Sequence, residues 1–349
     1  MRLGINVGYW GWGAFDEVVA LVQEAERLGF SCAWVAEAYG SDAVTAVTWL
    51  AARTERIDIG TAILQIPART PTMTAMTAAS LDMLSGGRFR LGIGVSGPQV
   101  SEGWHGVRFA KPLARTREYV DIIRLALRRE RVRYDGQTYQ LPLPDGPGKA
   151  LFLQIHPLRA DIPLYLAAIG PKNLELTGEI ADGWLPVFYA PSFASEHLAH
   201  IERGRAAVGK TLEGFDIAPT LGLSVGADVA ECASPLRAYS ALYIGGMGSR
   251  EQNFYNDLAV RMGFEDAAAT VQERYLARDY DAAMAAVPLE FIDSTALLGP
   301  RDRIAERMTE YAAGGVGTLN VMPYGSSLDE RLAGLRVAAE ALDKSGVGS

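Results

Sequence analysis

The chain has 349 residues, of which 49% are apolar, and a formal net charge of −8. This length fits one α/β barrel with insertions or two smaller domains, and it allows a large core that needs no disulfide bonds. An acidic chain without a basic patch is unsuited to nucleic acid, so we expect no nucleic-acid partner.

The two cysteines, Cys32 and Cys232, lie far apart in the chain and form no CxxC motif. They indicate a reducing compartment. The stretch 1–13 has one arginine and lacks the apolar segment of a signal peptide, and there is no run of about 18 apolar residues that could span a bilayer. The sequence therefore predicts a cytoplasmic protein with no membrane partner.

The first part of the chain alternates strands with helices. Strands are expected at 3–7, 32–36, 57–64 and 89–95. Helices are expected at 15–28, at 41–53 with a serine and an aspartate suited to an N-cap, and at 71–84 with a proline at its start. The strands are apolar almost throughout, which is typical of a parallel sheet covered on both faces.

The second part continues this pattern between two interruptions. Its expected strands are 163–168, 184–188, 215–225 and 318–322, and its expected helices are 113–129, 171–181, 192–208, 304–313 and 327–344. The interruptions are an irregular stretch at about 130–160, with short strands at 138–141 and 151–155, and a mostly helical stretch at about 230–298. Eight strands with helices after them predict a (β/α)8 TIM barrel with two insertions, forming one domain over 1–349. A doubly wound sheet is the alternative.

The active site of such a barrel lies at the C-terminal ends of its strands. One candidate stretch, 89–106, begins as a strand that contains Gly92 and Gly94, and it is expected to break into a loop at Ser96-Gly97-Pro98. Glycines in a strand allow another backbone or a flat ligand to come close. Packing and ligand binding both explain these glycines, and the sequence leaves both interpretations open.

Glu37 follows the second expected strand. A carboxylate at this point could act as a general acid or base, or it could bind a loop or cap the helix that begins near Ser41. Asp42 is interpreted as a helix-start residue. His105, beside Trp104, is the histidine nearest the expected site.

The turn Ala168-Ile169-Gly170 leads into a helix, and its backbone N–H groups could hold a phosphate with help from Lys172. An ordinary strand-to-helix turn is the alternative. His197 and His200, beside Glu196, could bind a metal, but we favour a solvated helix face and expect no metal site. Aromatic residues of the expected site loops could line a slot for a flat cofactor and an apolar substrate: Tyr9, Trp10, Trp12, Tyr39, Trp104, Phe188 and Tyr189.

Motifs of several enzyme classes are missing. The chain has no GxSxG, HExxH or GxxxxGK[ST] motif, and no GxGxxG after its first strand. The α/β-hydrolase, zincin, P-loop and Rossmann interpretations therefore lack their sequence support.

Several segments together resemble the bacterial luciferase-like superfamily, and most closely its branch that uses coenzyme F420, a deazaflavin. The segments are WVAEAYGSDA, IGTAILQIPARTPT, LDMLSGGRFRLGIGVSGPQVSEGWHG, KPLARTREYVDIIR, AAIGPKN and ADGWLPVF. The resemblance covers nearly the whole chain in a consistent order. It implies a barrel fold, which agrees with the count of strands, and it suggests a homodimer.

The resemblance also implies where the cofactor binds. It places a non-prolyl cis peptide at Ala62-Ile63, behind the deazaflavin ring, and the tail phosphate at the turn 168–170. Glu37 takes the place of an acidic residue near the reactive carbon, and His105 is the second candidate catalytic residue. The cofactor-binding residues expected on this basis are Gly8, Glu37, Ala62, Ile63, Gln65, Val95, Ser96, Gly97, Pro98, Gln99, Val100, Ala168, Ile169 and Gly170.

The chain departs from some relatives at two positions. Ala38 stands where some have a histidine after the acid, and Gly97 stands near the point where sugar-phosphate dehydrogenase relatives have a glutamate. Oxidation of a sugar phosphate by that acid–base pair is therefore not expected, and the proton donor stays open.

Three functional hypotheses follow from the resemblance. The first is an oxidoreductase that transfers a hydride between reduced coenzyme F420 and a small organic substrate at a C=C, C=N or alcohol/ketone group. The second is an FMN-dependent luciferase-like monooxygenase. The third is a protein that binds a deazaflavin or flavin without catalysis.

Overall fold

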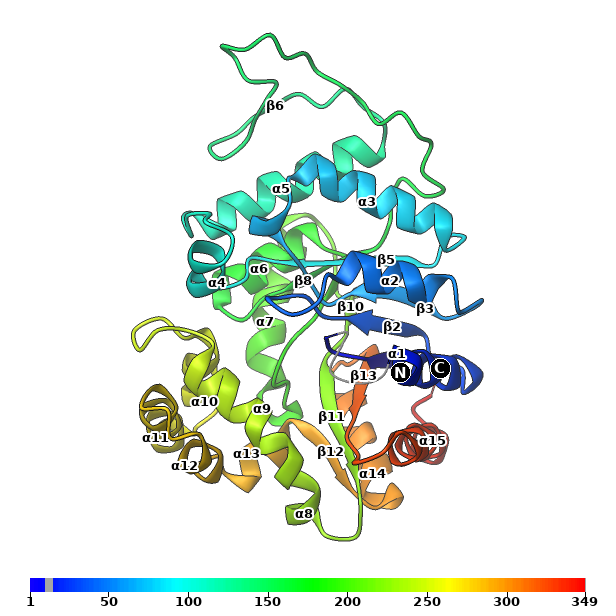
Figure 1. Ribbon diagram of the computed structural model, residues 1–349, viewed down its shortest axis with the longest axis vertical. Coiled ribbons are helices and arrows are strands. Elements are labelled where there is room, and N and C mark those ends of the chain that lie inside the picture. The colour runs from blue at the N-terminus through cyan, green and yellow to red at the C-terminus, as the bar shows by residue number, and fades with distance from the viewer. Residues whose placement is uncertain (10–14, 349) are drawn as a thin grey trace.

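The computed structural model describes residues 1–9 and 15–348, and it shows a curled sheet of parallel strands surrounded by helices (Figure 1). The strands that form the barrel wall are β1 (Arg2–Asn6), β2 (Cys32–Val35), β3 (Asp58–Thr61), β4 (Leu64–Gln65), β5 (Phe89–Gly94), β8 (Leu164–Ala167), β9 (Gly183–Trp184), β10 (Asp216–Ile217), β11 (Thr220–Val225) and β13 (Thr318–Pro323). Neighbouring strands in this wall pair in parallel. The predicted TIM-barrel fold is confirmed.

The seventh expected strand closes the barrel, although it is divided at Ala218 and Pro219 into β10 and β11. β10 pairs with β9, and β11 pairs with β13. Between these pairings, the N–H of Gly317 donates to the carbonyl of Ile217, and the N–H of Asn320 donates to that of Pro219. Both edges of this one strand are therefore bonded, which the alternative of an open doubly wound sheet does not allow.

A further strand, β12 (Ala296–Gly299), pairs with the end of β11. The sequence placed these residues at the end of the helical insertion, and that assignment was wrong. β9 pairs with the N-terminal part of the seventh strand, and β12 pairs with the same edge of its C-terminal part. The barrel wall therefore opens at its C-terminal end between β9 and β11.

Helices cover the outside of the barrel at the predicted places. They are α1 (Phe15–Arg27), α2 (Ala43–Ala51), α3 (Pro71–Leu84), α5 (Pro112–Leu127), α6 (Pro171–Ile180), α7 (Ala194–Ala207), α14 (Arg301–Ala313) and α15 (Leu328–Ser345). The side chain of Asp42 accepts a hydrogen bond from the N–H of Thr45, so its predicted role at the start of α2 is confirmed. The main core lies between these helices and the outward-facing strand residues, such as Ile5, Val35 and Leu91.

The inside of the barrel is filled by large rings beside glycines. The rings of Trp34 and Tyr165 meet edge to face with their centroids 5.1 Å apart. A Cβ atom at Gly60 would lie 2.5 Å from the Trp34 ring, and one at Gly183 would lie 2.3 Å from the Tyr165 ring. These two strand positions therefore need glycine so that the rings can fill the barrel.

The first insertion contains a small hairpin of β6 (Tyr134–Asp135) and β7 (Gln140–Leu141), which projects at the top of Figure 1. The carboxylate of Glu118 on α5 accepts three backbone N–H groups of this hairpin. No strand forms at 151–155, where one was predicted. The Pro- and Gly-rich composition of this stretch favours its irregular path.

The second insertion forms a compact group of short helices with its own apolar core. The helices are α8 (Val229–Ala233), η3 (Ser234–Leu236), α9 (Arg237–Ala241), the π-helix η4 (Leu242–Gly246), α10 (Phe254–Arg261), α11 (Glu265–Leu276), α12 (Tyr280–Ala285) and α13 (Leu289–Ser294). Phe188, which follows β9, belongs to the same core. The insertion is thereby attached beside the opening between β9 and β11.

Two short elements differ from the predictions. The sixth strand was predicted at 184–188, but β9 ends at Trp184, and Phe188 has a left-handed φ of 55°. The stretch after Ser96 was predicted as a loop, but a short helix, α4 (Pro98–Gly103), begins there, since proline is tolerated at the first position of a helix. The remaining turns are η1 (Ile66–Ala68) and η2 (Pro191–Phe193). In the described ranges, there is no helix with the length and apolar character needed to cross a bilayer.

Candidate functional site

The cis peptide expected from the resemblance is present between Ala62 and Ile63, where the chain leaves β3. Ile63 packs toward β5, and a Cβ atom at Gly94 would lie 2.6 Å from its Cδ1. A Cβ atom at Gly92 would lie 1.9 Å from the carbonyl oxygen of Thr61. Close packing against this bulge therefore accounts for both glycines of the strand.

Glu37 lies beside the bulge, and its side chain is only 7% exposed. Its two carboxylate oxygens accept hydrogen bonds from the guanidinium of Arg69 at 2.5 and 2.9 Å. They also accept the backbone N–H groups of Ala43 and Gln65, at 3.1 and 3.4 Å. The carboxylate thus holds together the bulge, the start of α2 and Arg69, as the loop-binding interpretation proposed.

Gln65 links this carboxylate to His105. Its side-chain N–H donates to the carbonyl of Ala38 at 2.7 Å, and its Oε1 lies 3.0 Å from Nε2 of His105. A hydrogen bond to the Gln65 oxygen requires a proton on Nε2 of the imidazole. His105 is half-buried and follows α4. Three of the predicted site residues are therefore joined in one network.

The residues predicted around the deazaflavin ring at 95–100 lie after β5 and at the start of α4, the helix that His105 follows. Val95 to Pro98 are half-buried, and Gln99 is exposed. Val100 faces the interior and is 3% exposed. Gly97 begins α4 without a capping side chain, which leaves backbone N–H groups at this helix start. Gly8 lies at the end of β1, where its N–H donates to Oδ1 of Asn6.

The predicted phosphate turn follows β8, which pairs with β5. Gly170 begins α6, and no side chain caps this helix. The guanidinium of Arg261, from α10 of the insertion, donates to the carbonyl of Ile169 at 3.2 Å and to Glu196 at 2.8 Å. An uncapped helix start beside a guanidinium has the chemistry that a phosphate requires. Lys172 is exposed.

His197 does not lie on a solvated helix face, so that prediction was wrong. The side chain is 2% exposed and packs between the rings of Trp184 and Phe193. Burial, with the positive charges of Arg261 and His200, lowers its pKa to about 4, so the imidazole is neutral. Among the described residues, there is no group of three His, Cys, Asp or Glu side chains that could hold a metal ion.

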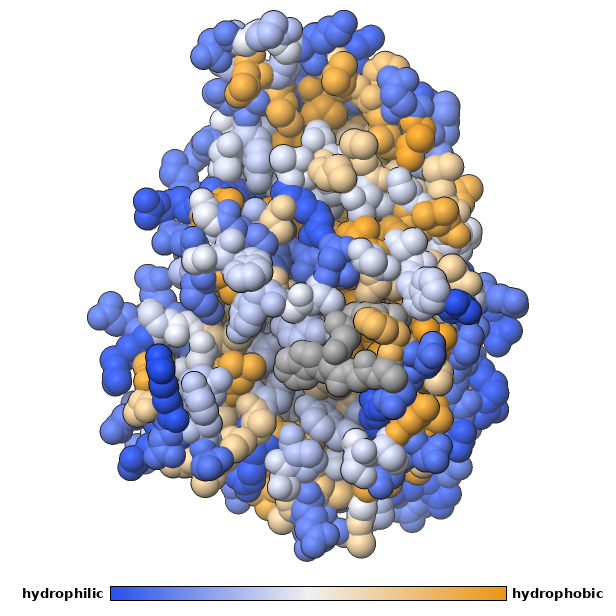
Figure 2. Space-filling model, in the orientation of Figure 1, coloured by the Kyte–Doolittle hydropathy of each residue, from blue (hydrophilic) through white to orange (hydrophobic). Residues whose placement is uncertain are grey.

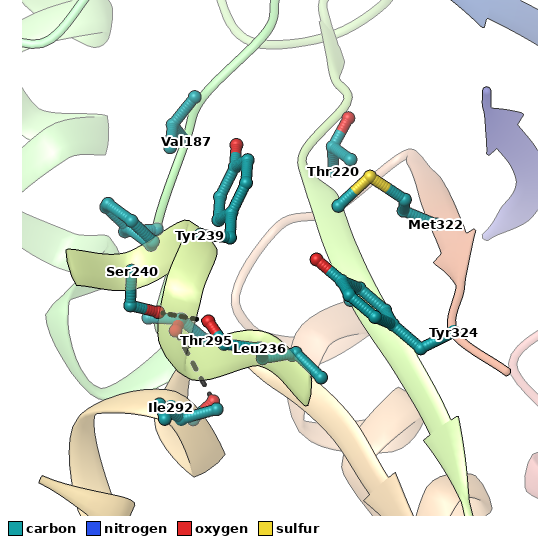
Figure 3. Close-up of a pocket in the computed structure, with 11 residues that line it drawn as sticks. Val187, Thr220, Leu236, Tyr239, Ser240, Ile292, Thr295, Met322 and Tyr324 are labelled. Atoms are coloured by element: carbon teal, nitrogen blue, oxygen red, sulfur yellow. Dashed lines mark hydrogen bonds between the residues drawn. The ribbon is translucent and has the colours of Figure 1, made fainter. Parts of the chain in front are cut away.

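A pocket opens at the C-terminal end of the barrel between β11, β13 and the chain after β9 (Figure 3). Its lining residues are Val187, Phe188, Thr220, Gly222, Leu236, Tyr239, Ser240, Ile292, Thr295, Met322 and Tyr324. Of the aromatic residues predicted at the site, Phe188 lines this pocket, and the buried Tyr189 donates to the carbonyl of Gly314 instead. Tyr39 and Trp104 are exposed. Trp10 and Trp12 lie outside the described residues.

Sequence reasoning missed the residues that reach the site from distant segments. Arg69 lies in the stretch after the third expected strand, and nothing in the local sequence indicated its pairing with Glu37. Arg261 and the pocket residue Tyr239 belong to an insertion that carried no recognisable motif. No local pattern could have identified them, because only the fold brings the insertion to the barrel.

The chain is similar to known proteins over most of its length. Residues 4–318 match the family described as luciferase-like monooxygenase. The chain is 44% identical over 334 residues to a Mycobacterium tuberculosis protein that carries the name of a coenzyme F420-dependent oxidoreductase, covering 94% of this chain and 96% of that one. It is 30% identical to the 5,10-methylenetetrahydromethanopterin reductase of Archaeoglobus fulgidus, covering 86% and 88%.

A solved structure shares the fold. It is the coenzyme F420-dependent tetrahydromethanopterin reductase of Methanopyrus kandleri, with a TM-score of 0.83, 24% identity and 97% of each chain covered.

Proposed function

The chain belongs to the luciferase-like monooxygenase family, and from this premise we propose that it is an oxidoreductase that uses coenzyme F420. The enzyme transfers a hydride between the reduced cofactor and a small organic substrate. One observation carries the proposal: the bulge at Ala62-Ile63, the His105 network and the uncapped start of α6 lie at the ends of neighbouring strands. In this arrangement a flat ring would lie against the bulge, and a phosphate tail would reach the start of α6.

Different residues of this chain bind the ring and the phosphate of the cofactor. The bulge and Val95 to Pro98 support the ring, and the N–H groups at the start of α6, together with Arg261, hold the phosphate. Coenzyme F420, when bound, supplies the hydride chemistry. The barrel mouth keeps the substrate next to the ring and limits access of water.

His105 is the proposed proton-carrying residue. Both oxygens of Glu37 already accept hydrogen bonds from Arg69 and from backbone groups, so Glu37 fits a positioning role better than that of an acid. His105 has a hydrogen bond only at Nε2, and its Nδ1 has no hydrogen-bond partner among the described residues. Gln65 and Glu37 together fix the orientation of its ring.

Titration with two cofactors tests the proposed function. Binding of coenzyme F420 and, separately, of FMN is followed by fluorescence. We expect tight binding of F420 and weak binding of FMN. Preference for FMN, with oxygen consumption, would instead favour a monooxygenase, and F420 binding without turnover of any substrate would favour a binding protein.

Variants at three positions test the roles of the residues. Arg261→Ala should weaken binding of F420 about tenfold but leave binding of the phosphate-free deazariboflavin unchanged, because one charge-assisted contact is lost. Arg274→Ala, on the exposed face of α11, is the matched control.

His105→Asn should lower kcat about 100-fold and change the pH profile, whereas Glu37→Gln should lower kcat without changing that profile. An unchanged kcat in His105→Asn would remove His105 from the mechanism.

A homodimer is the proposed assembly. Met73, Met76 and Met83 form a half-exposed apolar stripe on α3, beside Leu84, and Trp49 of α2 is exposed as well. Figure 2 shows apolar side chains gathered over the upper part of the molecule, where α3 lies. Light scattering after gel filtration should give twice the mass of the chain, and Met76→Glu should give monomers.

A further inference from the structure

The pocket at the barrel mouth lies across from the expected cofactor site. Most of the expected cofactor residues follow β3, β5 and β8, and Gly8 and Glu37 follow β1 and β2. The pocket belongs instead to β11, β13 and the insertion (Figure 3). Thr220 and Met322 point into the barrel from two neighbouring strands, and Tyr239 faces them from α9. The pocket is therefore positioned to hold the substrate beside the cofactor.

The pocket carries no charge on any of its lining residues, all of which are described. Burial raises the pKa of Tyr324 to about 12 and that of Tyr239 well above its usual value, so both phenols stay neutral. A carboxylate or phosphate that entered this pocket would lose its hydration without gaining a cation, which is unfavourable. The pocket therefore selects against ionised groups.

Only some of its hydroxyl groups are available to a ligand. Ser240 and Thr295 donate to carbonyls four residues earlier in the chain, at Leu236 and at Phe291. The hydroxyl of Thr220 instead accepts the side-chain N–H of Asn6 at 3.1 Å, while Oδ1 of Asn6 accepts the N–H of Gly8. This chain of bonds fixes the direction of the Asn6 amide, so Thr220 is an acceptor toward Asn6 and keeps its own proton.

The Thr220 proton has no acceptor among the described residues, and the side chain is half-buried at the pocket. A half-buried donor of this kind gains a hydrogen bond when a ligand oxygen binds beside it. The pair Asn6 and Thr220 therefore presents an oriented donor in a largely apolar and aromatic pocket, in which the Tyr324 hydroxyl is a second polar group.

We propose that this pocket binds an uncharged, largely apolar ketone or alcohol, whose oxygen accepts the hydrogen bond of Thr220. The inference rests on the proposed function and names its substrate class. Thr220 is a residue that sets specificity, and Asn6 positions it. The aromatic rings of Phe188, Tyr239 and Tyr324 provide the contact surface for the apolar part of the substrate.

The experiment uses the full chain and begins with titration of coenzyme F420. Calorimetry on the F420 complex then measures binding of cyclohexanone, cyclohexanol, acetophenone and the charged analogue 4-oxocyclohexanecarboxylate. We expect the neutral compounds to bind at least about 30-fold more tightly than the carboxylate. Thr220→Val should weaken binding of cyclohexanone about tenfold and leave F420 affinity unchanged.

Two further variants complete the test. Thr309→Val removes a hydroxyl that donates to a helix carbonyl on α14, outside the site, and should change neither affinity. Met322→Arg should reverse the preference in favour of the carboxylate. Equal or tighter binding of the carboxylate by the unmodified protein, no binding of any neutral probe, or an unchanged affinity in Thr220→Val would overturn the inference while F420 still binds. Failure of F420 to bind would instead overturn the proposed function.

Discussion

The two ends of the barrel interior differ in charge. At the N-terminal end, Arg2, Asp58, Arg90 and Asp216 lie together with Tyr165 and Thr318, and we call these six residues the basal cluster. At the C-terminal end, the pocket is lined by rings, apolar chains and hydroxyls without any charge. One end is closed by paired ions, and the other is kept neutral.

The basal cluster is balanced in charge and densely bonded. Arg90 lies 2.7 Å from Asp58 and 3.7 Å from Asp216, and Arg2 lies 3.2 Å from Asp216. One oxygen of Asp216 also accepts the hydroxyls of Tyr165 and Thr318 at 2.9 Å. Groups from six strands are thus joined where the barrel needs only to be stable. The pocket, by contrast, leaves the hydroxyl protons of Thr220 and Tyr324 without an acceptor among the described residues, and a bound ligand can supply one.

The largest effect is expected when the basal cluster loses one charge. Asp216→Asn leaves two arginines facing one aspartate, and breaking a buried ion pair costs about 3–5 kcal/mol of the free energy of unfolding. Urea denaturation measures this loss. Asp302→Asn, at an exposed pair with Lys344, is the control and should have little effect. Similar losses in both variants would show that the basal cluster contributes no more than a surface pair.

A neutral buried histidine beside the barrel wall gives the next effect. The pKa of His197 is about 4 in the folded protein, below the usual 6.5, so the unfolded chain binds more protons between these values. Stability is therefore fully present above about pH 6.5 and is lost as the pH falls toward 4, by at most about 3 kcal/mol. Urea denaturation at several pH values measures the free energy of unfolding of the unmodified protein and of His197→Phe. The difference between these two free energies should become smaller as the pH falls from about 6.5 toward 4. Parallel pH curves would contradict this assignment.

A matched pair of tyrosines compares the two ends directly. Tyr165 donates to Asp216 and accepts from Arg90 at 3.2 Å, whereas the Tyr324 hydroxyl has no hydrogen-bond partner among the described residues. Tyr165→Phe should cost about 1–3 kcal/mol in stability, and Tyr324→Phe less than about 0.5 kcal/mol. Thermal or urea unfolding separates these values. A larger cost for Tyr324→Phe would mean that the Tyr324 hydroxyl makes a hydrogen bond that stabilises the barrel mouth.

The smallest effect is expected in the chemical labelling of Cys32, at the N-terminal end of the barrel. Burial raises the pKa of Cys32, which lies among the charges of the basal cluster. The thiolate is the reactive form, so a thiol reagent should leave Cys32 unlabelled in the folded protein. The buried Cys232 should behave in the same way. Rapid labelling of either thiol without denaturant would show that this part of the barrel opens.

The sequence by itself determined the repeating part of the fold. Apolar strands, N-cap residues such as Asp42 and helix-start prolines such as Pro71 are local patterns, and they predicted the helices and strands of the barrel wall. The resemblance identified the cis peptide at Ala62-Ile63. Glu37 and His105 were singled out by their positions near the ends of expected strands, and the structure joins them through Gln65 in one network.

Only the tertiary structure decided which distant side chains meet. Arg69 reaches Glu37 across 32 positions, Arg261 reaches Ile169 across 92, and Asn6 reaches Thr220 across 214. The burial of His197 and the pairing of β12 likewise depend on neighbours that no local pattern specifies. Periodicity reports the face of an element that is buried, but the partners on that face are fixed by the closure of the barrel and by the path of the insertion.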